Sequence, residues 1–120
     1  MQSIRLKGIA LPVSRLCVGG CPAGEYGWGK VDHAQIENAI RRAYELGLNF
    51  FDTADTYGLG RSEQNMGEVL RPVRERVVIA TKFGVRVEGG KPFYDTSPAY
   101  IDRALGESLK RLHTDYIDLY

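Results

Sequence analysis

Apolar residues recur along this chain at two alternating spacings, one typical of buried strands and the other of amphipathic helices. Short, largely apolar runs at Leu48 to Phe51 and Val77 to Ala80 are expected of strands buried in a parallel sheet. Between these runs, apolar positions repeat every three or four residues, as in helices with one buried face. The alternation predicts strands and helices in turn, joined by connections short enough for right-handed parallel crossovers. We therefore expect an α/β fold.

The predicted helices have recognisable ends. Asp32 followed by Gln35 is a capping-box arrangement and starts the first helix. Pro72 ends a second helix that begins near residue 62, and Ser97, which precedes a proline, starts the third. The expected apolar faces are Ile36, Ala39, Ile40, Ala43 and Leu46 in the first helix, Met66, Val69 and Leu70 in the second, and Ile101, Leu105, Leu109 and Leu112 in the third.

Two hairpins and two further strands complete the predicted order. Residues 3–14 alternate loosely around Gly8 and predict an N-terminal hairpin. Leu16 to Gly19 is expected to be a first buried strand, and Tyr116 to Tyr120 begins a fourth. Alternating apolar residues on either side of Gly89-Gly90 predict a small second hairpin.

Composition limits the classes of function. With 120 residues, 43% of them hydrophobic, the chain is expected to form one small globular domain. A net charge of +1 attracts neither nucleic acid nor an anionic membrane, and we expect neither as a partner. Cys17 and Cys21 are too few for a disulfide framework and lack further metal ligands nearby, so we expect reduced thiols, no metal and a cytoplasmic location. Arg15 interrupts the first apolar run, so no targeting segment is predicted.

Three titratable side chains leave the ends of neighbouring strands: Asp52, Tyr57 and Lys82. The carboxyl ends of parallel strands are where α/β folds bind ligands. An ammonium group favours the phenolate form of a nearby tyrosine, and a carboxylate keeps the lysine charged. The trio therefore suits a proton relay in which Tyr57 donates to an oxygen that gains negative charge.

The same three residues also allow an interpretation in which each has only a structural role. An aspartate at a strand end often caps the next loop, a tyrosine often packs, and a lysine is usually solvated. The loop from Cys21 to Lys30 also allows two interpretations: its glycines and Trp28 suit either a ligand-binding loop or an ordinary surface loop.

Several linked segments resemble the aldo-keto reductases. They are Gly47 to Gly58 with Ser62-Glu63 after it, Ile79 to Gly84, Ser108 to Leu112, and Asp115 to Tyr120. Together they span nearly the whole chain in the order and spacing of that family. The resemblance implies a parallel (β/α)8 TIM barrel that reduces aldehydes and ketones to alcohols with NADPH.

The resemblance also implies roles for single residues. Tyr57 would be the proton donor, Lys82 would favour its ionisation, and Asp52 would pair with Lys82. Asp52, Gly20 and Cys21 would lie near the cofactor, and Trp28 with Tyr57 would line the pocket of the small carbonyl substrate.

The chain departs from the family at its end. The family has a fourth catalytic residue, a histidine a few residues past Tyr120, and neither His33 nor His113 is positioned to replace it. A complete barrel takes about 250 residues. We therefore expect residues 1–120 to be a single partial domain, truncated at its C-terminus, that supplies about half of the barrel and does not turn over substrate alone. The alternatives are a non-catalytic regulatory or binding subunit related to this family, and an independent small α/β binding domain.

Overall fold

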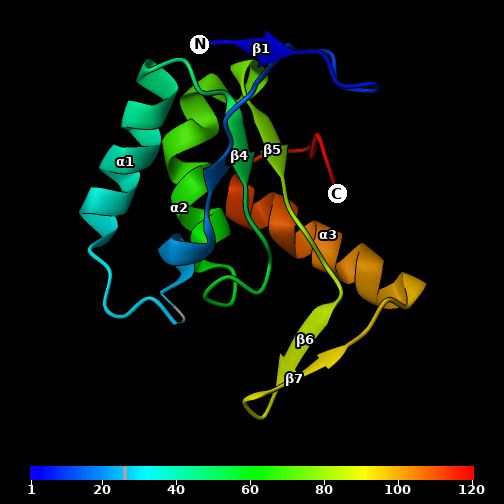
Figure 1. The fold of residues 1–120 in the computed structure, drawn as a ribbon. Helices are drawn as coiled ribbons and strands as arrows, with labels where there is room; N and C mark the ends of the chain where they lie inside the picture. The colour runs from blue at the N-terminus through cyan, green and yellow to red at the C-terminus, as the bar shows by residue number, and fades with distance from the viewer. Residues whose placement is uncertain (26) are drawn as a thin grey trace.

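The computed structural model describes residues 1–25 and 27–120, and Tyr26 lies outside the described residues. Three parallel strands, β3 (Val18–Gly19), β4 (Phe50–Asp52) and β5 (Val78–Ala80), form the central sheet in that order. A parallel bridge between Ala80 and Leu119 extends it at the β5 edge. The helical elements are η1 (Cys21–Gly24), α1 (His33–Glu45), α2 (Arg61–Leu70), η2 (Arg71–Arg76) and α3 (Pro98–Leu112). Figure 1 shows α2 and α3 behind the strands and α1 to their left.

This architecture confirms the α/β expectation. Each parallel pair is joined through a helix, and the register places Val18 beside Phe51 and Phe51 beside Ile79. A parallel sheet with crossover helices on one face is the repeating layout of a (β/α)8 barrel, as expected from the resemblance. The predicted fourth strand is present only as the bridge at Leu119.

Helix starts and stops follow the local sequence. The Asp32 carboxylate accepts hydrogen bonds from the backbone N–H groups of Ala34 and Gln35, as the capping prediction requires. The Gln35 side chain donates to the same carboxylate instead of reaching the Asp32 backbone. Gly47 has a φ of 88° and ends the helix, and the Ser97 hydroxyl accepts from the N–H of Tyr100 at the start of α3.

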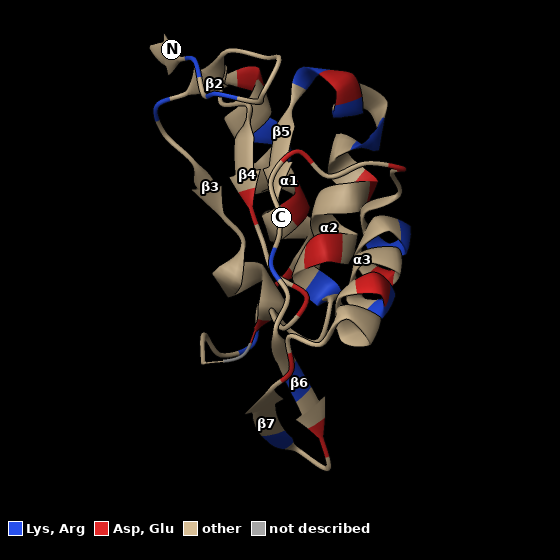
Figure 2. Ribbon diagram, turned by 90° about the vertical axis from the view of Figure 1, so that its right-hand side faces the viewer, with Lys and Arg blue, Asp and Glu red and all other residues tan. Residues whose placement is uncertain are grey.

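The core lies between the sheet and the helices. Phe51 and Ile79, from β4 and β5, are fully buried against α2 and the end of α3. Figure 2 shows charged residues mainly on the helices and the β6–β7 hairpin, with few on the parallel strands. The buried residues of this cluster are Ile40, Phe51, Met66, Leu70, Val77, Ile79 and Leu112.

Two helix faces differ from the sequence prediction. The buried line of α3 runs through Tyr100, Ala104, Ser108 and Leu112, one position away from most of the predicted apolar face. Predicted residues 101, 105 and 109 are half-buried. The reason is close packing at Gly67 of α2, where a Cβ would stand 2.7 Å from Leu112, so this side of α3 turns toward α2. In α1, only Ile40 of the predicted face is buried.

Hairpins lie beyond both ends of the sheet (Figure 1). Strands β1 (Ser3–Ile4) and β2 (Val13–Ser14) form the predicted N-terminal hairpin. It lies at the end of the sheet where the parallel strands begin. The Asn49 side chain fixes this hairpin to β4, because it donates to Pro12 O and accepts from the N–H of Ser14, each at 2.8 Å. Strands β6 (Val85–Glu88) and β7 (Lys91–Tyr94) form the second predicted hairpin beyond the other end. In the described part of the chain, no helix has both the length and the apolar character needed to cross a membrane.

Candidate active site

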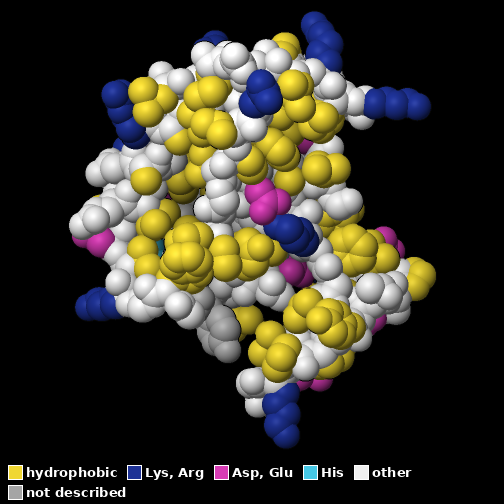
Figure 3. All heavy atoms as spheres, in the orientation of Figure 1, with side chains coloured by type: hydrophobic (Ala, Val, Ile, Leu, Met, Phe, Trp, Pro, Cys, Tyr) yellow, Lys and Arg dark blue, Asp and Glu magenta, His cyan; other side chains and the backbone are white. Residues whose placement is uncertain are grey.

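The ammonium group of Lys82 is held at the carboxyl ends of β4 and β5. Its Nζ lies 2.8 Å from each carboxylate oxygen of Asp52 and 2.7 Å from the carbonyl oxygen of Thr53. The pair is partly exposed and contributes about 1 kcal/mol or less to stability. Its main effect is to fix the position of the ammonium group. Figure 3 shows a face of the molecule on which many side chains are hydrophobic and a compact group of charged side chains lies near the middle.

Tyr57 lies next to this ion pair, as the sequence predicted. Lys82 Nζ is 5.0 Å from the centroid of the Tyr57 ring, close enough for a favourable interaction with the ring face. The three ammonium donors point to Asp52 and Thr53, so Lys82 acts on the phenol through space and not through a hydrogen bond. No described residue forms a hydrogen bond with the Tyr57 hydroxyl.

The turn that carries Tyr57 is packed against η1. A Cβ on Gly24 would stand 2.5 Å from the Tyr57 carbonyl carbon, and Gly58 is equally close to the Gly24 backbone. Gly58 has a φ of 64°, a conformation that glycine adopts without strain. The N–H of Tyr57 donates to Ala54 O at 3.2 Å. These contacts fix where the Tyr57 side chain leaves the backbone.

Gly20 lies directly beside Asp52. Its N–H donates to Asp52 O at 2.7 Å, and a Cβ on Gly20 would stand 2.5 Å from the Ser62 hydroxyl of α2. The need for glycine is therefore accounted for by helix packing, and its place near a cofactor stays a prediction.

The other two predicted binding residues follow Gly20 along the chain. Cys21 opens η1 and is half-buried. Trp28 is 60% exposed in the next loop and does not contact the Asp52–Lys82 pair through any described hydrogen bond. Cys17, which the sequence did not single out, has a thiol pKa raised by burial and then by the nearby Asp52 carboxylate.

Glu63 is a site residue whose role the sequence reasoning missed. This carboxylate is fully buried in α2, where it accepts a hydrogen bond from the Thr81 hydroxyl and another from Arg111 Nε, both at 2.6 Å. A usable pattern was present, because Glu63 shares the helical face of Met66 and Leu70. A carboxylate on a buried face requires polar partners.

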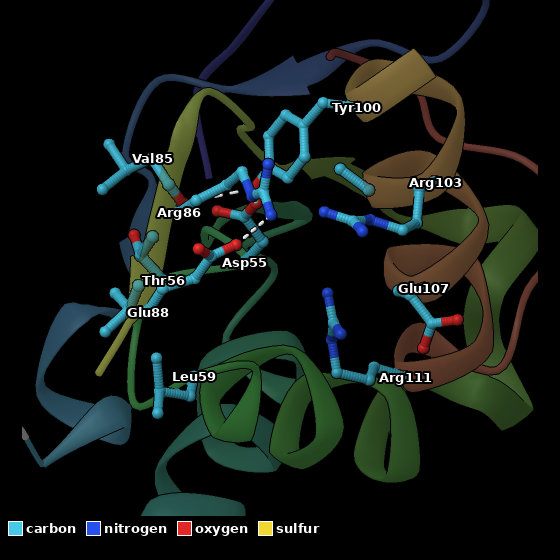
Figure 4. Close-up of a pocket in the computed structure, with 12 residues that line it drawn as sticks. Asp55, Thr56, Leu59, Val85, Arg86, Glu88, Tyr100, Arg103, Glu107 and Arg111 are labelled. Carbon is cyan, nitrogen blue, oxygen red and sulfur yellow. Dashed lines mark hydrogen bonds and ion pairs between the residues drawn. The ribbon is translucent and has the colours of Figure 1, made fainter. Parts of the chain in front are cut away.

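Asp55 is a second missed residue, two positions before Tyr57. It lines a cavity of about 350 Å³ between the Tyr57 turn, the β6–β7 hairpin and α3, with Tyr100, Arg103 and Arg111 around it (Figure 4). The Tyr100 hydroxyl lies 3.2 Å from both Asp55 Oδ2 and Val85 O. Burial raises the pKa of the Asp55 carboxyl group, although the bond from Tyr100 opposes the shift.

Neither histidine lies near the Asp52–Lys82 pair. His33 begins α1, where its Nε2 is 3.2 Å from Glu25 Oε1. His113 is exposed at the C-terminal end of α3 and lines a cavity with η2, at the end of the sheet where the strands begin. Both histidines are exposed.

Comparisons with known proteins give one consistent family. A model described as "Aldo/keto reductase family" matches residues 15–120. The aldo-keto reductase YhdN of Bacillus subtilis is 34% identical over all of this chain and 37% of its own length. The solved structure of aldo-keto reductase AKR11C1 from Bacillus halodurans, in its holo form, has a TM-score of 0.85 and 38% identity, covering 98% of this chain and 38% of that one.

A further solved structure was determined with a cofactor. It is an aldo-keto reductase from Klebsiella pneumoniae in complex with NADPH, with a TM-score of 0.71 and 30% identity, covering 98% of this chain and 38% of that one. The chain thus spans less than two fifths of the length of these relatives.

Proposed function

Because this chain belongs to the aldo/keto reductase family, we propose that Tyr57 is the proton donor in the NADPH-dependent reduction of an aldehyde or ketone to an alcohol. One observation carries the proposal: the Lys82 ammonium group is bound by Asp52 on one side and stands 5.0 Å from the Tyr57 ring on the other.

The protein side of the reaction follows from these three residues. The Tyr57 hydroxyl donates its proton to the carbonyl oxygen as that oxygen gains negative charge. The positive charge of Lys82 stabilises the phenolate that remains, because a nearby opposite charge favours the charged form of a titratable group. Asp52 and the Thr53 carbonyl group hold Lys82 in place, so no reorganisation is needed when the charge forms.

NADPH supplies the hydride when it is bound. At the end of the sheet, the Gly20 N–H donates to the backbone oxygen of Asp52 and places the start of η1 beside the partly exposed Asp52 carboxylate. We assign Asp52, Gly20 and Cys21 to the cofactor side and Trp28 with Tyr57 to the substrate side. The NADPH complex of a similar reductase supports the choice of cofactor.

The activity is proposed for a barrel and not for 120 residues in isolation. The chain matches less than two fifths of the length of its relatives, and a (β/α)8 barrel draws its catalytic residues from several strand ends. We expect the isolated chain to be inactive.

Replacing Tyr57 with Phe tests the proton donor. The protein that contains this chain within a barrel is assayed for consumption of NADPH with a panel of aldehydes and ketones, and NADPH binding is followed by its fluorescence. Tyr57→Phe should lose turnover and keep cofactor binding, whereas Tyr94→Phe, at a highly exposed position on β7, should behave as wild type. Turnover retained in Tyr57→Phe would remove Tyr57 from this role. If the wild-type barrel binds NADPH without turning over any of the panel, the regulatory or binding alternative gains support.

A further inference from the structure

The first turn of α2 connects the ends of all three parallel strands. Ser62 and Glu63 are adjacent, both fully buried, and each bonds to a different part of the sheet edge. Because they share one rigid helix, the groups they bind are held at a fixed separation.

Ser62 joins β3 to β4. Its hydroxyl donates to Gly20 O and accepts from the Thr53 hydroxyl, each at 2.8 Å. Thr53 follows Asp52 directly, and its carbonyl oxygen is one of the three acceptors of the Lys82 ammonium group. Thr53 therefore links the Ser62 hydroxyl to both members of the ion pair: Thr53 follows Asp52 in the chain, and its carbonyl oxygen accepts from Lys82.

Glu63 joins α2 to β5 and α3. One carboxylate oxygen accepts from the Thr81 hydroxyl and the other from Arg111 Nε, each at 2.6 Å. Thr81 directly precedes Lys82, and Arg111 neutralises the buried charge. Ser62 thus fixes the strand end beside Asp52, and Glu63 fixes the strand end beside Lys82.

We propose that Ser62 and Glu63 are positioning residues that set the separation of Asp52 and Lys82, through the hydroxyl groups of Thr53 and Thr81. The catalytic role of Asp52 and Lys82 rests on the proposed reductase function. The positioning itself is a property of the folded chain and can be measured without turnover.

The reactivity of the Lys82 amine measures this positioning. An acylating reagent reacts with a lysine side chain that can leave its hydrogen-bond acceptors, and Lys82 Nζ is held by both carboxylate oxygens of Asp52 and by Thr53 O. Lys82 is about half exposed, so the reagent can reach it. The experiment acylates the purified protein briefly with acetic anhydride and quantifies each lysine by mass spectrometry, with exposed Lys91 as the internal reference.

Two variants and a matched control are compared. Ser62→Ala removes the bond between β3 and β4, and Thr81→Val removes the bond from β5 to Glu63. Ser14→Ala is the control: this buried serine donates to Leu16 O at 2.7 Å and lies at the opposite end of the sheet. Circular dichroism establishes that each variant is folded, and Thr81→Val alone decides the result if Ser62→Ala does not fold.

We expect acylation of Lys82 relative to Lys91 to rise about fivefold in Ser62→Ala and in Thr81→Val, the factor that corresponds to one net hydrogen bond. Ser14→Ala should leave the ratio unchanged. A reactivity of Lys82 that stays at the wild-type value in the folded variants would overturn the proposal, even if their melting temperatures fall. Absence of turnover in the wild-type barrel would instead contradict the reductase function and leave this measurement valid.

Discussion

The backbones of Gly24 and Gly58 lie in direct contact, so a Cβ atom on either residue would overlap the other. Gly24 belongs to η1, and Gly58 follows Tyr57 in the turn before α2. The contact fixes the Tyr57 turn against the segment that follows β3. The position of the proposed proton donor therefore depends on two residues that carry no side chain.

Gly24→Ala should destabilise the chain by about 1–3 kcal/mol, the range for overpacking a close-packed site. The added methyl group would stand 2.5 Å from the Tyr57 carbonyl carbon, and backbone cannot move as a flexible side chain does. Gly106→Ala is the control, because a Cβ there meets nothing within 4 Å and should stabilise α3 by about 1 kcal/mol. Urea unfolding monitored by circular dichroism measures both, and equal effects of the two substitutions would contradict the expectation.

The carboxyl group of Asp55 makes stability depend on pH. Burial raises its pKa in the folded chain above the ordinary 3.8, so the folded chain holds this proton to a higher pH than the unfolded chain does. The resulting stabilisation is complete below the ordinary value and is lost as the pH rises through the raised pKa. An ionised Asp55 thus opposes folding at neutral pH.

Asp55→Asn removes this penalty and keeps an acceptor for the Tyr100 hydroxyl. We expect the variant to melt at a higher temperature than wild type near pH 7, with the gap closing toward about pH 4. Differential scanning calorimetry across this range makes the comparison. Asp102→Asn, at an exposed position on α3, should show no such dependence. A gap that widens as the pH falls would contradict the sign of the effect.

Arg74 is the most extensively bonded buried cation in the described chain. Its guanidinium donates to Val77 O, Thr114 Oγ1 and Tyr116 O and forms an ion pair with Asp118 at 2.8 Å. Arg74→Met should cost about 3–5 kcal/mol, because it leaves the Asp118 carboxylate partly buried without its partner. Arg76→Met, at the exposed end of η2, should change stability by about 0.5 kcal/mol or less. Similar urea midpoints for the two variants would show that the Arg74 bonds make no net contribution to the free energy of unfolding.

Lys82→Met tests the electrostatic role assigned to this lysine. In a barrel that contains the chain, turnover should fall by about 100-fold or more, since the phenolate loses its neighbouring positive charge. The fold should persist because Lys82 is only half-buried. Steady-state rates with NADPH measure the loss, and Lys91→Met on the β6–β7 hairpin is the control. A rate within a factor of about two of wild type would contradict the assignment.

The features predicted correctly from sequence are those decided within a few residues. The Asp32 cap and the Ser97 start depend on neighbours at most three positions away. Asp52, Tyr57 and Lys82 could be expected to lie near one another because parallel strands bring their carboxyl ends to one edge. Their relative placement needed only the strand order.

What could not be predicted depends on pairs distant in sequence. The most distant partners of Ser62 and Glu63 lie 42 and 48 residues away, at Gly20 and Arg111. The buried face of α3 is set by the close approach of Gly67 in α2 to Leu112 in α3. The helical spacing of the leucines in α3 does not by itself predict this face. The buried strand predicted over residues 16–19 forms only at Val18–Gly19, and Leu16, which is 59% exposed, lies in the bend between β2 and β3.

The bonds of Arg74 also impose an order on synthesis. Its partners Thr114, Tyr116 and Asp118 follow it by 40 to 44 residues. When β5 leaves the ribosome, Arg74 has emerged before its counter-charge Asp118, which lies 44 residues further along the chain. Until residues 118 and 119 emerge, Arg74 lacks its ion-pair partner and the β5 edge lacks its bridge to Leu119. The β5 edge can therefore be completed only after these residues have emerged.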